Sequence, residues 1–184
     1  MLNAIHKFDP QFNQASSFLK KTIQEYVKSD WEACLDIPCG NGRNTFLLAD
    51  YFELVTAIDV QPNYLSSIES VQERYGNPKI DTLCLDILVE PIIDLSRYQF
   101  ICNIHFFDSK LITSILKGMA KGAYFLIETP SCNGGNFIDL PTEMELQAII
   151  NSQQLVNYNF RPCLHKRNTE KRGAFKALIK KEYD

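Results

Sequence analysis

Two glycines and two acidic residues of this chain stand where they can act on one ligand. The apolar run that ends at Ile37 is followed by a turn that contains Gly40 and Gly42. Asp59 and Asp86 each end a later apolar run. Glycine adopts positive φ angles and lets a ligand come close to the backbone, and a helix that starts after such a turn attracts negative groups. This composition is typical of a cofactor-binding turn.

The acids at the two later strand ends fit the sugar and the base of a nucleoside. A carboxylate at Asp59 can accept both hydroxyl protons of a ribose, and one at Asp86 can accept hydrogen bonds from an adenine amino group. Val60 and Ile87, which follow these acids, offer apolar surface to the two faces of the ring. Each signal alone is weak, because an aspartate that closes a strand commonly forms a turn or caps a helix. Together, in order at successive strand ends, they predict a nucleoside-containing cofactor.

The segments that position these residues alternate between strands and helices. Apolar periodicity predicts a first helix over 13–28, and Asp108 and Thr142 are placed to cap later helices. The predicted strands are 31–37, 54–59, 79–85, 99–104 and 124–128. Three helices are predicted between them: one that follows the first strand and ends at residue 51, one over 62–75 and one over 108–119. Parallel strands need long crossovers that pack on the sheet. The alternation therefore predicts a doubly wound α/β domain with helices on both faces.

The end of the chain departs from this alternation. Two extended segments, 155–164 and 173–183, flank a polar run without a helix between them, which predicts an antiparallel hairpin. With 184 residues, the chain is long enough for one domain with a full core and short for two. We therefore assign 31–184 to one domain, and 1–30 to an N-terminal lid or anchor helix that is part of it.

The stretch from Ala33 to Thr45, an acidic residue followed by a glycine-rich turn, resembles the first motif of the class I S-adenosylmethionine-dependent methyltransferases. The resemblance extends from about Trp31 to Ile179. It implies a Rossmann-like, seven-stranded sheet that is mostly parallel, with an antiparallel strand in the C-terminal hairpin. It also implies S-adenosylmethionine as the cofactor.

The resemblance assigns a part of the cofactor to each strand end. Asp36 is expected near the methionine amino group, Gly40 at the backbone of the methionine part, and Asp59 at the ribose. Asp86 is expected at the adenine, and the backbone of Asn103 at the methionine amine. The whole expected cofactor-binding set is Asp36, Cys39, Gly40, Gly42, Arg43, Asp59, Val60, Asp86, Ile87 and Asn103.

Two positions differ from the family pattern. Pro38 replaces the first glycine of the motif and has no N–H to donate to a cofactor, and Ala123 replaces a common glycine before the fifth strand. The run from Asn41 to Asn44 is similar to that of the tellurite-resistance type of small-molecule methyltransferase. A nicotinamide-dependent enzyme is disfavoured, because the turn lacks a third glycine at Thr45.

His105 follows the fourth strand and is the candidate catalytic residue. An imidazole at this edge could take a proton from an oxygen, nitrogen or sulfur nucleophile; the alternative is a histidine that packs under the helix after it. The polar loop from Glu128 to Asn136 lies over the same edge, where loops often carry function. The aromatic lead from Phe8 to Phe12 could close over the site or anchor the first helix.

Composition and charge limit the classes of substrate and the cell compartment that we expect for this protein. The formal net charge of -3 argues against general attraction to nucleic acid, and the basic run from Lys166 to Arg172 is typical of a solvated turn. The six scattered cysteines are expected to be reduced thiols, and the three distant histidines predict no metal site. No apolar run is long enough to span a membrane, and the N-terminus has no leader pattern, so we expect a cytoplasmic protein.

These observations predict a methyltransferase that acts on a small molecule and binds neither nucleic acid nor membrane. Two other functions stay open at this point. One is a catalytically silent cofactor-binding protein, which the proline at 38 favours. The other is an RNA methyltransferase that uses the basic run, although Asn103 to Phe107 does not match the motif of DNA amino-methylating enzymes. The sequence defines neither the methyl acceptor nor the oligomeric state.

Overall fold

The computed structural model describes residues 15–75, 79–90, 94–131, 143–150, 154–161, 164–166, 169–171 and 173–182. The aromatic lead, the predicted cap at Thr142 and the loop after residue 131, with Asn133 and Asn136, lie outside these residues. The helical elements are α1 (Ser17–Tyr26), α2 (Thr45–Leu48), α3 (Pro62–Tyr75), η3 (Leu95–Arg97), α4 (Ser109–Gly118) and α5 (Glu143–Ile150). No helix of the described part is both long and apolar enough to cross a membrane.

The strands are β1 (Ala33–Asp36), β2 (Leu54–Asp59), β3 (Ile80–Cys84), β4 (Phe100–Ile104), β5 (Tyr124–Ser131), β6 (Gln154–Arg161), β7 (Leu164–Lys166), β8 (Thr169–Lys171) and β9 (Gly173–Lys180). The main sheet that they form has seven strands in the order β3-β2-β1-β4-β5-β9-β6. The strands from β3 to β5 are parallel, and β9 is antiparallel to both of its neighbours, so it alone runs against the others of this sheet. The predicted mostly parallel sheet with an antiparallel strand from the C-terminal hairpin is confirmed.

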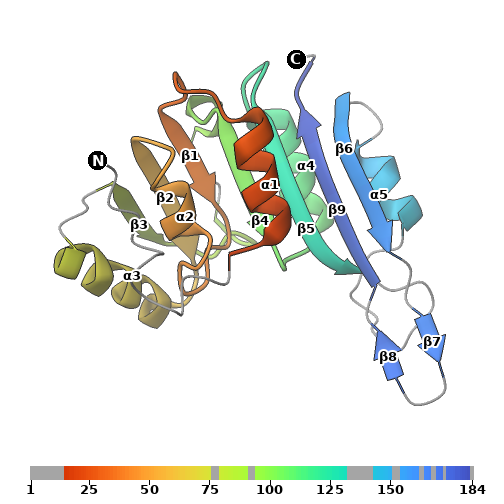
Figure 1. Ribbon diagram of the computed structural model, residues 1–184, viewed down its shortest axis with the longest axis horizontal. Helices are drawn as coiled ribbons and strands as arrows, with labels where there is room; N and C mark the ends of the chain where they lie inside the picture. The colour runs from red at the N-terminus through yellow and green to blue at the C-terminus, as the bar shows by residue number, and fades with distance from the viewer. Residues whose placement is uncertain are drawn as a thin grey trace.

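Helices cover both faces of the sheet, as the alternation predicted (Figure 1). Alternate residues of β1 supply the two cores: Cys34 packs in the cluster with α1, α2 and α3, and Leu35 in the cluster with α4. Both side chains are fully buried. In β1 and β2 the acidic residue is the last residue of the strand, so the loops that follow can form a site.

Side-chain caps stabilise the N-termini of α1 and α4. The Oγ of Ser16 accepts hydrogen bonds from the N–H groups of Phe18 and Leu19, at 3.1 and 3.2 Å. Asp108 accepts from the N–H of Leu111 at 2.7 Å, which makes it the predicted cap of α4. Such caps satisfy N–H groups that have no partner within the helix, and each stabilises it by about 1 kcal/mol.

Most predicted boundaries differ from the structure by a few residues; the first helix, expected over 13–28, is Ser17–Tyr26. Three differences have a clear cause in the structure. The helix expected to end at Tyr51 is limited to the four residues of α2, because the chain beyond it tightens into i→i−3 bonds such as that from the Tyr51 N–H to the Leu48 carbonyl. Strand β5 continues to Ser131 because it pairs with β9 along its whole length. The expected single turn of the C-terminal hairpin instead forms the separate pair β7–β8, beyond the edge where β5 ends (Figure 1).

Candidate functional site

The order of the main sheet reverses between β1 and β4, because β2 and β3 lie on one side of β1 and β5 lies beyond β4. In open α/β sheets a ligand binds beyond the carboxyl ends of the strands at such a point. The glycine turn follows β1 here, and His105 follows β4. A hydrogen bond of 3.3 Å joins Arg43 Nη2 to His105 Nδ1 across this point. The fold thus brings the predicted cofactor turn and the predicted catalytic residue together.

The two glycines of the turn differ in the space around their Cα atoms. Both have positive φ, 55° at Gly40 and 86° at Gly42. A Cβ at Gly42 would lie 2.7 Å from Ile68 Cγ1 and 2.9 Å from Phe46 Cε2, so this position is needed for packing against α2 and α3. A Cβ at Gly40 would meet no atom within 4 Å. Gly40 therefore exposes its backbone to open space, where a ligand can approach it.

Asp59, at the end of β2, ties the turn to the sheet. Its Oδ2 accepts from the Gly40 N–H at 2.8 Å, and its Oδ1 accepts from the Gln61 N–H at 2.9 Å. The residue is 6% exposed. A carboxylate has about four lone-pair positions, so these bonds leave it able to accept hydroxyl protons. Asp59 thus has a structural role in the turn in addition to the predicted ribose contact.

Asp36 is a fully buried carboxyl group that is only partly satisfied. Its Oδ2 accepts from the Thr45 hydroxyl at 2.6 Å, and its Oδ1 has no hydrogen-bond partner. Burial raises the pKa of this carboxyl from 3.8 to about 7; the Thr45 hydrogen bond and the charge of Arg43 act in the opposite direction, and Asp59 adds to the rise. A carboxylate oxygen without a partner has the chemistry to accept a hydrogen bond from an ammonium group.

Cys39 and Asn103, both expected at the cofactor, are buried beside these groups. Burial, followed by the charges of Asp36 and Asp59, raises the pKa of the Cys39 thiol well above its usual range, so this thiol is no nucleophile. The Cys39 N–H instead donates to the Ile58 carbonyl at 2.8 Å. Asn103 is 0% exposed, and neither its Oδ1 nor its Nδ2 has a partner. A buried amide without a partner costs about 1–3 kcal/mol.

The residues expected at the adenine lie after β2 and β3, two neighbouring strands. Val60 is 50% exposed, and Ile87 is partly buried against the α4-side core. Asp86 uses its Oδ1 to accept from the Leu88 N–H at 3.0 Å, so it also forms the turn after β3. This arrangement provides apolar side chains and a carboxylate at one end of the strand edge.

His105 has a backbone conformation that is rare outside glycine, with a φ of 65°. Its N–H donates to the Glu128 carbonyl at 2.6 Å, which ties the end of β4 to β5. Burial and the nearby charge of Arg43 lower the pKa of the imidazole from its usual 6.5; Lys176 also lowers it, and Glu128 opposes them. Because strained residues that are held in place are concentrated at functional sites, this geometry supports a role for His105.

A network of Ser16, Glu128 and Lys176 borders the same edge. The Ser16 hydroxyl donates to Glu128 Oε2, and Lys176 Nζ lies 2.7 Å from Glu128 Oε1. The Ser16 N–H donates to Asn44 Oδ1 at 3.0 Å, which ties α1 to the glycine turn. Sequence reasoning missed Ser16, Lys176 and Thr45. Ser16 precedes a helix and is a preferred cap residue, which is the signal that the sequence offers for it.

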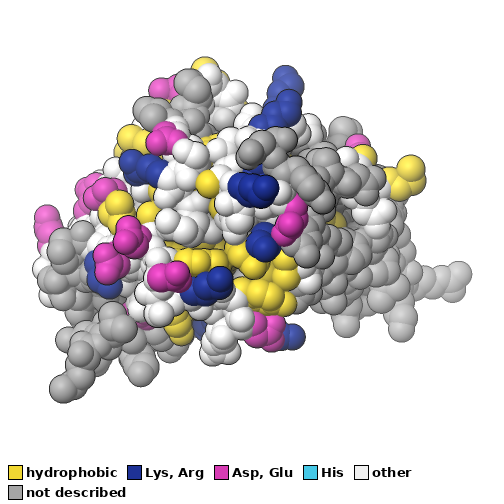
Figure 2. Space-filling view, turned by 90° about the horizontal axis from the view of Figure 1, so that it is seen from above, with side chains coloured by type: hydrophobic (Ala, Val, Ile, Leu, Met, Phe, Trp, Pro, Cys, Tyr) yellow, Lys and Arg dark blue, Asp and Glu magenta, His cyan; other side chains and the backbone are white. Residues whose placement is uncertain are grey.

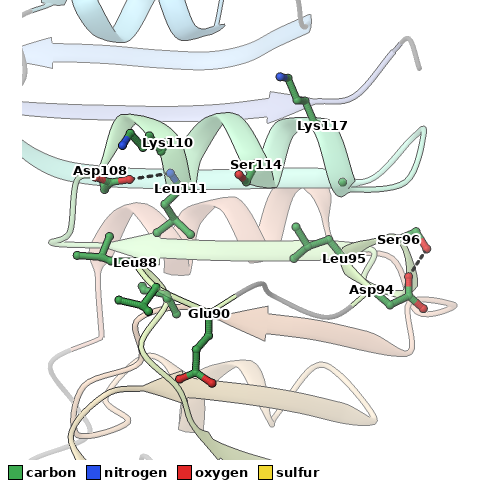
Figure 3. A pocket seen from close by; sticks show the side chains of 13 residues that line it. Leu88, Glu90, Asp94, Leu95, Ser96, Asp108, Lys110, Leu111, Ser114 and Lys117 are labelled. Atoms are coloured by element: carbon green, nitrogen blue, oxygen red, sulfur yellow. Dashed lines mark hydrogen bonds between the residues drawn. The ribbon is translucent and has the colours of Figure 1, made fainter.

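A hollow of about 990 Å³ lies beside α4, and its described lining contains no residue of the glycine turn. Figure 3 shows it between α4 and the segments around Leu88 and Leu95. Its described lining shares Ile87 with the expected cofactor residues and otherwise combines apolar and charged side chains, among them Glu90 and Lys110. Asp36 and Asn103, whose buried side chains have atoms without hydrogen-bond partners, lie at the strand edge instead, and we place the candidate site there.

The described part of the chain offers less support for a metal site or for cysteine chemistry. It contains no group of three or more His, Cys, Asp or Glu side chains that could hold a metal ion. Cys34, Cys39, Cys84 and Cys102 are free thiols, and Cys132 and Cys163 lie outside the described residues. The β7–β8 pair carries part of the basic run from Lys166 to Arg172.

Comparison with known proteins identifies a family and a fold. The family model described as "Tellurite resistance protein TehB" matches residues 14–172. TehB from Haemophilus influenzae is similar in structure, with a TM-score of 0.78 and 21% identity over 95% of this chain and 66% of that chain. This chain therefore spans less than two thirds of the length of the Haemophilus protein. A search of curated proteins gave no match.

Two further solved structures have the same fold. One is an S-adenosylmethionine-dependent methyltransferase from Clostridium acetobutylicum, with a TM-score of 0.67 and 16% identity over 94% of this chain and 92% of that chain. The other is the N-methyltransferase NodS from Bradyrhizobium japonicum, with a TM-score of 0.68 and 17% identity over 98% of both chains. At these identities the likeness shows the fold alone.

Proposed function

We propose that this chain, which belongs to the TehB family of class I S-adenosylmethionine-dependent methyltransferases, transfers a methyl group from S-adenosylmethionine to a small molecule. The observation that carries this proposal is the buried Oδ1 of Asp36, which has no hydrogen-bond partner and lies at the end of the strand that leads into the turn of Gly40. An amino acid supplies the complement of this carboxylate, an ammonium group. The methionine part of the cofactor has this group.

The remaining residues of the strand edge would bind the nucleoside. Asp59 would accept the ribose hydroxyl protons with the lone pairs that its bonds to Gly40 and Gln61 leave. Asp86 would face the adenine amino group, with Val60 and Ile87 against the ring. Cys39, Gly42 and Arg43 shape the turn, and the backbone of Asn103 would meet the methionine amine. In this proposal these residues hold one molecule along the ends of four strands.

When bound, the cofactor supplies a methyl group on a positively charged sulfur, ready for in-line displacement. The contribution of the protein is to orient the cofactor and acceptor and to keep water away from them, and such positioning can supply much of the rate. The edge of β4 and β5, with His105 and Glu128, borders the place where an acceptor would approach. The free, buried thiols of Cys34, Cys39 and Cys102 fit a reducing compartment such as the cytoplasm.

Charge favours a small acceptor over RNA. The formal net charge is -3, and RNA binding through phosphates needs a basic face. Figure 2 views the edge where the parallel strands begin, opposite the candidate site, and on that edge the described acidic and basic side chains are interspersed. The basic run of the β7–β8 hairpin is the feature of this chain that favours RNA, and its contribution is directly measurable.

A pair of glycine variants tests whether the turn binds the cofactor. Gly40 and Gly122 both have positive φ, 55° and 84°, and a Cβ at either would meet nothing within 4 Å. Gly40→Ala and Gly122→Ala should therefore each lower the free energy of unfolding by roughly 1–2 kcal/mol. Only Gly40→Ala places a methyl group where the cofactor would lie, so it alone should weaken binding of S-adenosylhomocysteine, by at least about tenfold. Equal affinity of the two variants in calorimetry would contradict the assignment.

A further inference from the structure

The hydrogen bond of 3.3 Å between Arg43 Nη2 and His105 Nδ1 determines which nitrogen of the imidazole carries the proton. A guanidinium group has N–H donors and no acceptor, and it stays protonated at every accessible pH. Nδ1 of His105 must therefore accept in this hydrogen bond. A neutral imidazole that accepts at Nδ1 has its proton on Nε2.

We propose that Arg43 holds His105 as the neutral tautomer with hydrogen on Nε2, so that His105 offers the methyl acceptor a hydrogen-bond donor and not a general base. This inference deepens the proposed methyl transfer and rests on it for the identity of the bound molecule. It takes the place of the proton-accepting role predicted for His105 from the sequence. Arg43 acts through His105 and is a positioning residue.

The other charged groups around His105 agree with this assignment. Glu128 is the acidic neighbour, on β5, but its carboxylate is engaged by the Ser16 hydroxyl and by Lys176. Lys176, on β9, and Arg43 both disfavour a positive imidazole, and together with burial they outweigh Glu128 and lower its pKa. The ring therefore stays neutral at pH 7. The hydrogen bond from the His105 backbone N–H to the Glu128 carbonyl holds the backbone that carries this ring.

This tautomer restricts the class of methyl acceptor. The acceptor must present a hydrogen-bond acceptor atom to Nε2–H, and His105 takes no proton from it. Its nucleophilic atom must bring an available lone pair, as an unprotonated amine or an anion does. That lone pair forms the bond to the methyl carbon, while the carbon–sulfur bond breaks and its electron pair goes to sulfur. A neutral alcohol, which must lose a proton to react, does not fit this class.

Nitrogen NMR on the 184-residue chain tests the tautomer without any ligand. Long-range proton–nitrogen spectra of ¹⁵N-labelled protein distinguish a protonated from an unprotonated ring nitrogen, and loss of signals in His105→Gln assigns them among the three histidines. At pH 8 the wild type should show hydrogen on Nε2 and none on Nδ1. A dominant Nδ1–H form would overturn the proposal.

Substitutions at Arg43 show whether this residue sets the tautomer. Arg43→Gln can donate or accept, so the Nε2–H preference should weaken and the pKa of His105 should rise toward 6.5. Arg43→Lys still only donates and should keep the preference. Arg74→Gln, an exposed change on α3, is the matched control and should leave the spectrum unchanged. An unchanged tautomer and pKa in Arg43→Gln would refute the role of Arg43.

Calorimetry with S-adenosylhomocysteine on the same samples separates the two proposals. Cofactor binding with the Nδ1–H tautomer would refute the inference and keep the proposed function. The Nε2–H tautomer without cofactor binding would refute the proposed function, and with it the assignment of a methyl acceptor to His105.

Discussion

Replacing Asp36 by Asn removes the buried carboxylate while keeping the size of the side chain and an oxygen for the Thr45 hydroxyl. In the wild type, burial raises the pKa of this carboxyl from 3.8 to about 7. At about 1.4 kcal/mol for each pH unit, the ionised form costs at most about 4 kcal/mol in the folded state. Above pH 7 this cost therefore lowers the free energy of unfolding of the wild type. Asp36→Asn has no ionisable group at this position and does not carry the cost.

The direction of the pH dependence follows from proton linkage. Between about pH 4 and pH 7 the folded state binds more protons at Asp36 than the unfolded state, because its pKa is the higher one. The contribution of this residue to stability is present below pH 4 and is lost as the pH rises through about 7. The advantage of Asp36→Asn should therefore grow between pH 4 and 7, toward the limit of about 4 kcal/mol, and stay constant above.

Urea unfolding of the wild type and Asp36→Asn at pH 5, 7 and 9 measures this difference. Asp81→Asn, a substitution of an exposed aspartate on β3, is the control and should change stability by less than about 0.5 kcal/mol. The more stable Asn variant should also lose affinity for S-adenosylhomocysteine, because it cannot attract the ammonium. A stability difference independent of pH, or a wild type that is the more stable at pH 9, would refute the account of Asp36.

Two other predictions concern the ribose and the substrate class. Asp59→Ala should weaken binding of S-adenosylhomocysteine by about 1.5–3 kcal/mol, the range for hydrogen bonds to a charged group, and should lower stability because Gly40 and Gln61 lose their acceptor; an unchanged dissociation constant in a folded variant would exclude the ribose contact. The wild type should have no measurable affinity for RNA at physiological salt. Micromolar binding that weakens with salt, and that is abolished by replacing Lys166, Arg167, Lys171 and Arg172 with Ser, would instead support an RNA substrate.

The sequence predicted the elements whose signals are local. The ranges of β2 and α3 agree with the expected residues 54–59 and 62–75, because an apolar run ends at an aspartate and a proline begins the following helix. The cap at Asp108 is a local signal of the same kind. The full length of β5 was not predictable from Thr129 and Pro130, because pairing with β9 extends it.

The candidate site was predictable in its positions but not in its interactions. The order of strand ends placed Gly40 and Asp59 together, since parallel strands share their carboxyl edge, and a hydrogen bond of 2.8 Å joins them. The bond between Ser16 and Glu128 joins residues 112 positions apart, and no local pattern encodes it. The unpartnered oxygen of Asp36 likewise depends on which atoms surround it in the folded chain.

The most direct test of the central claim is calorimetric titration of the wild type with S-adenosylmethionine, S-adenosylhomocysteine and NAD. The account predicts binding of the first two at one site per chain, with protons released near pH 7 as Asp36 ionises. It predicts much weaker binding of NAD. Tighter binding of NAD than of S-adenosylmethionine, or no binding of S-adenosylmethionine and S-adenosylhomocysteine to the folded protein, would contradict the account.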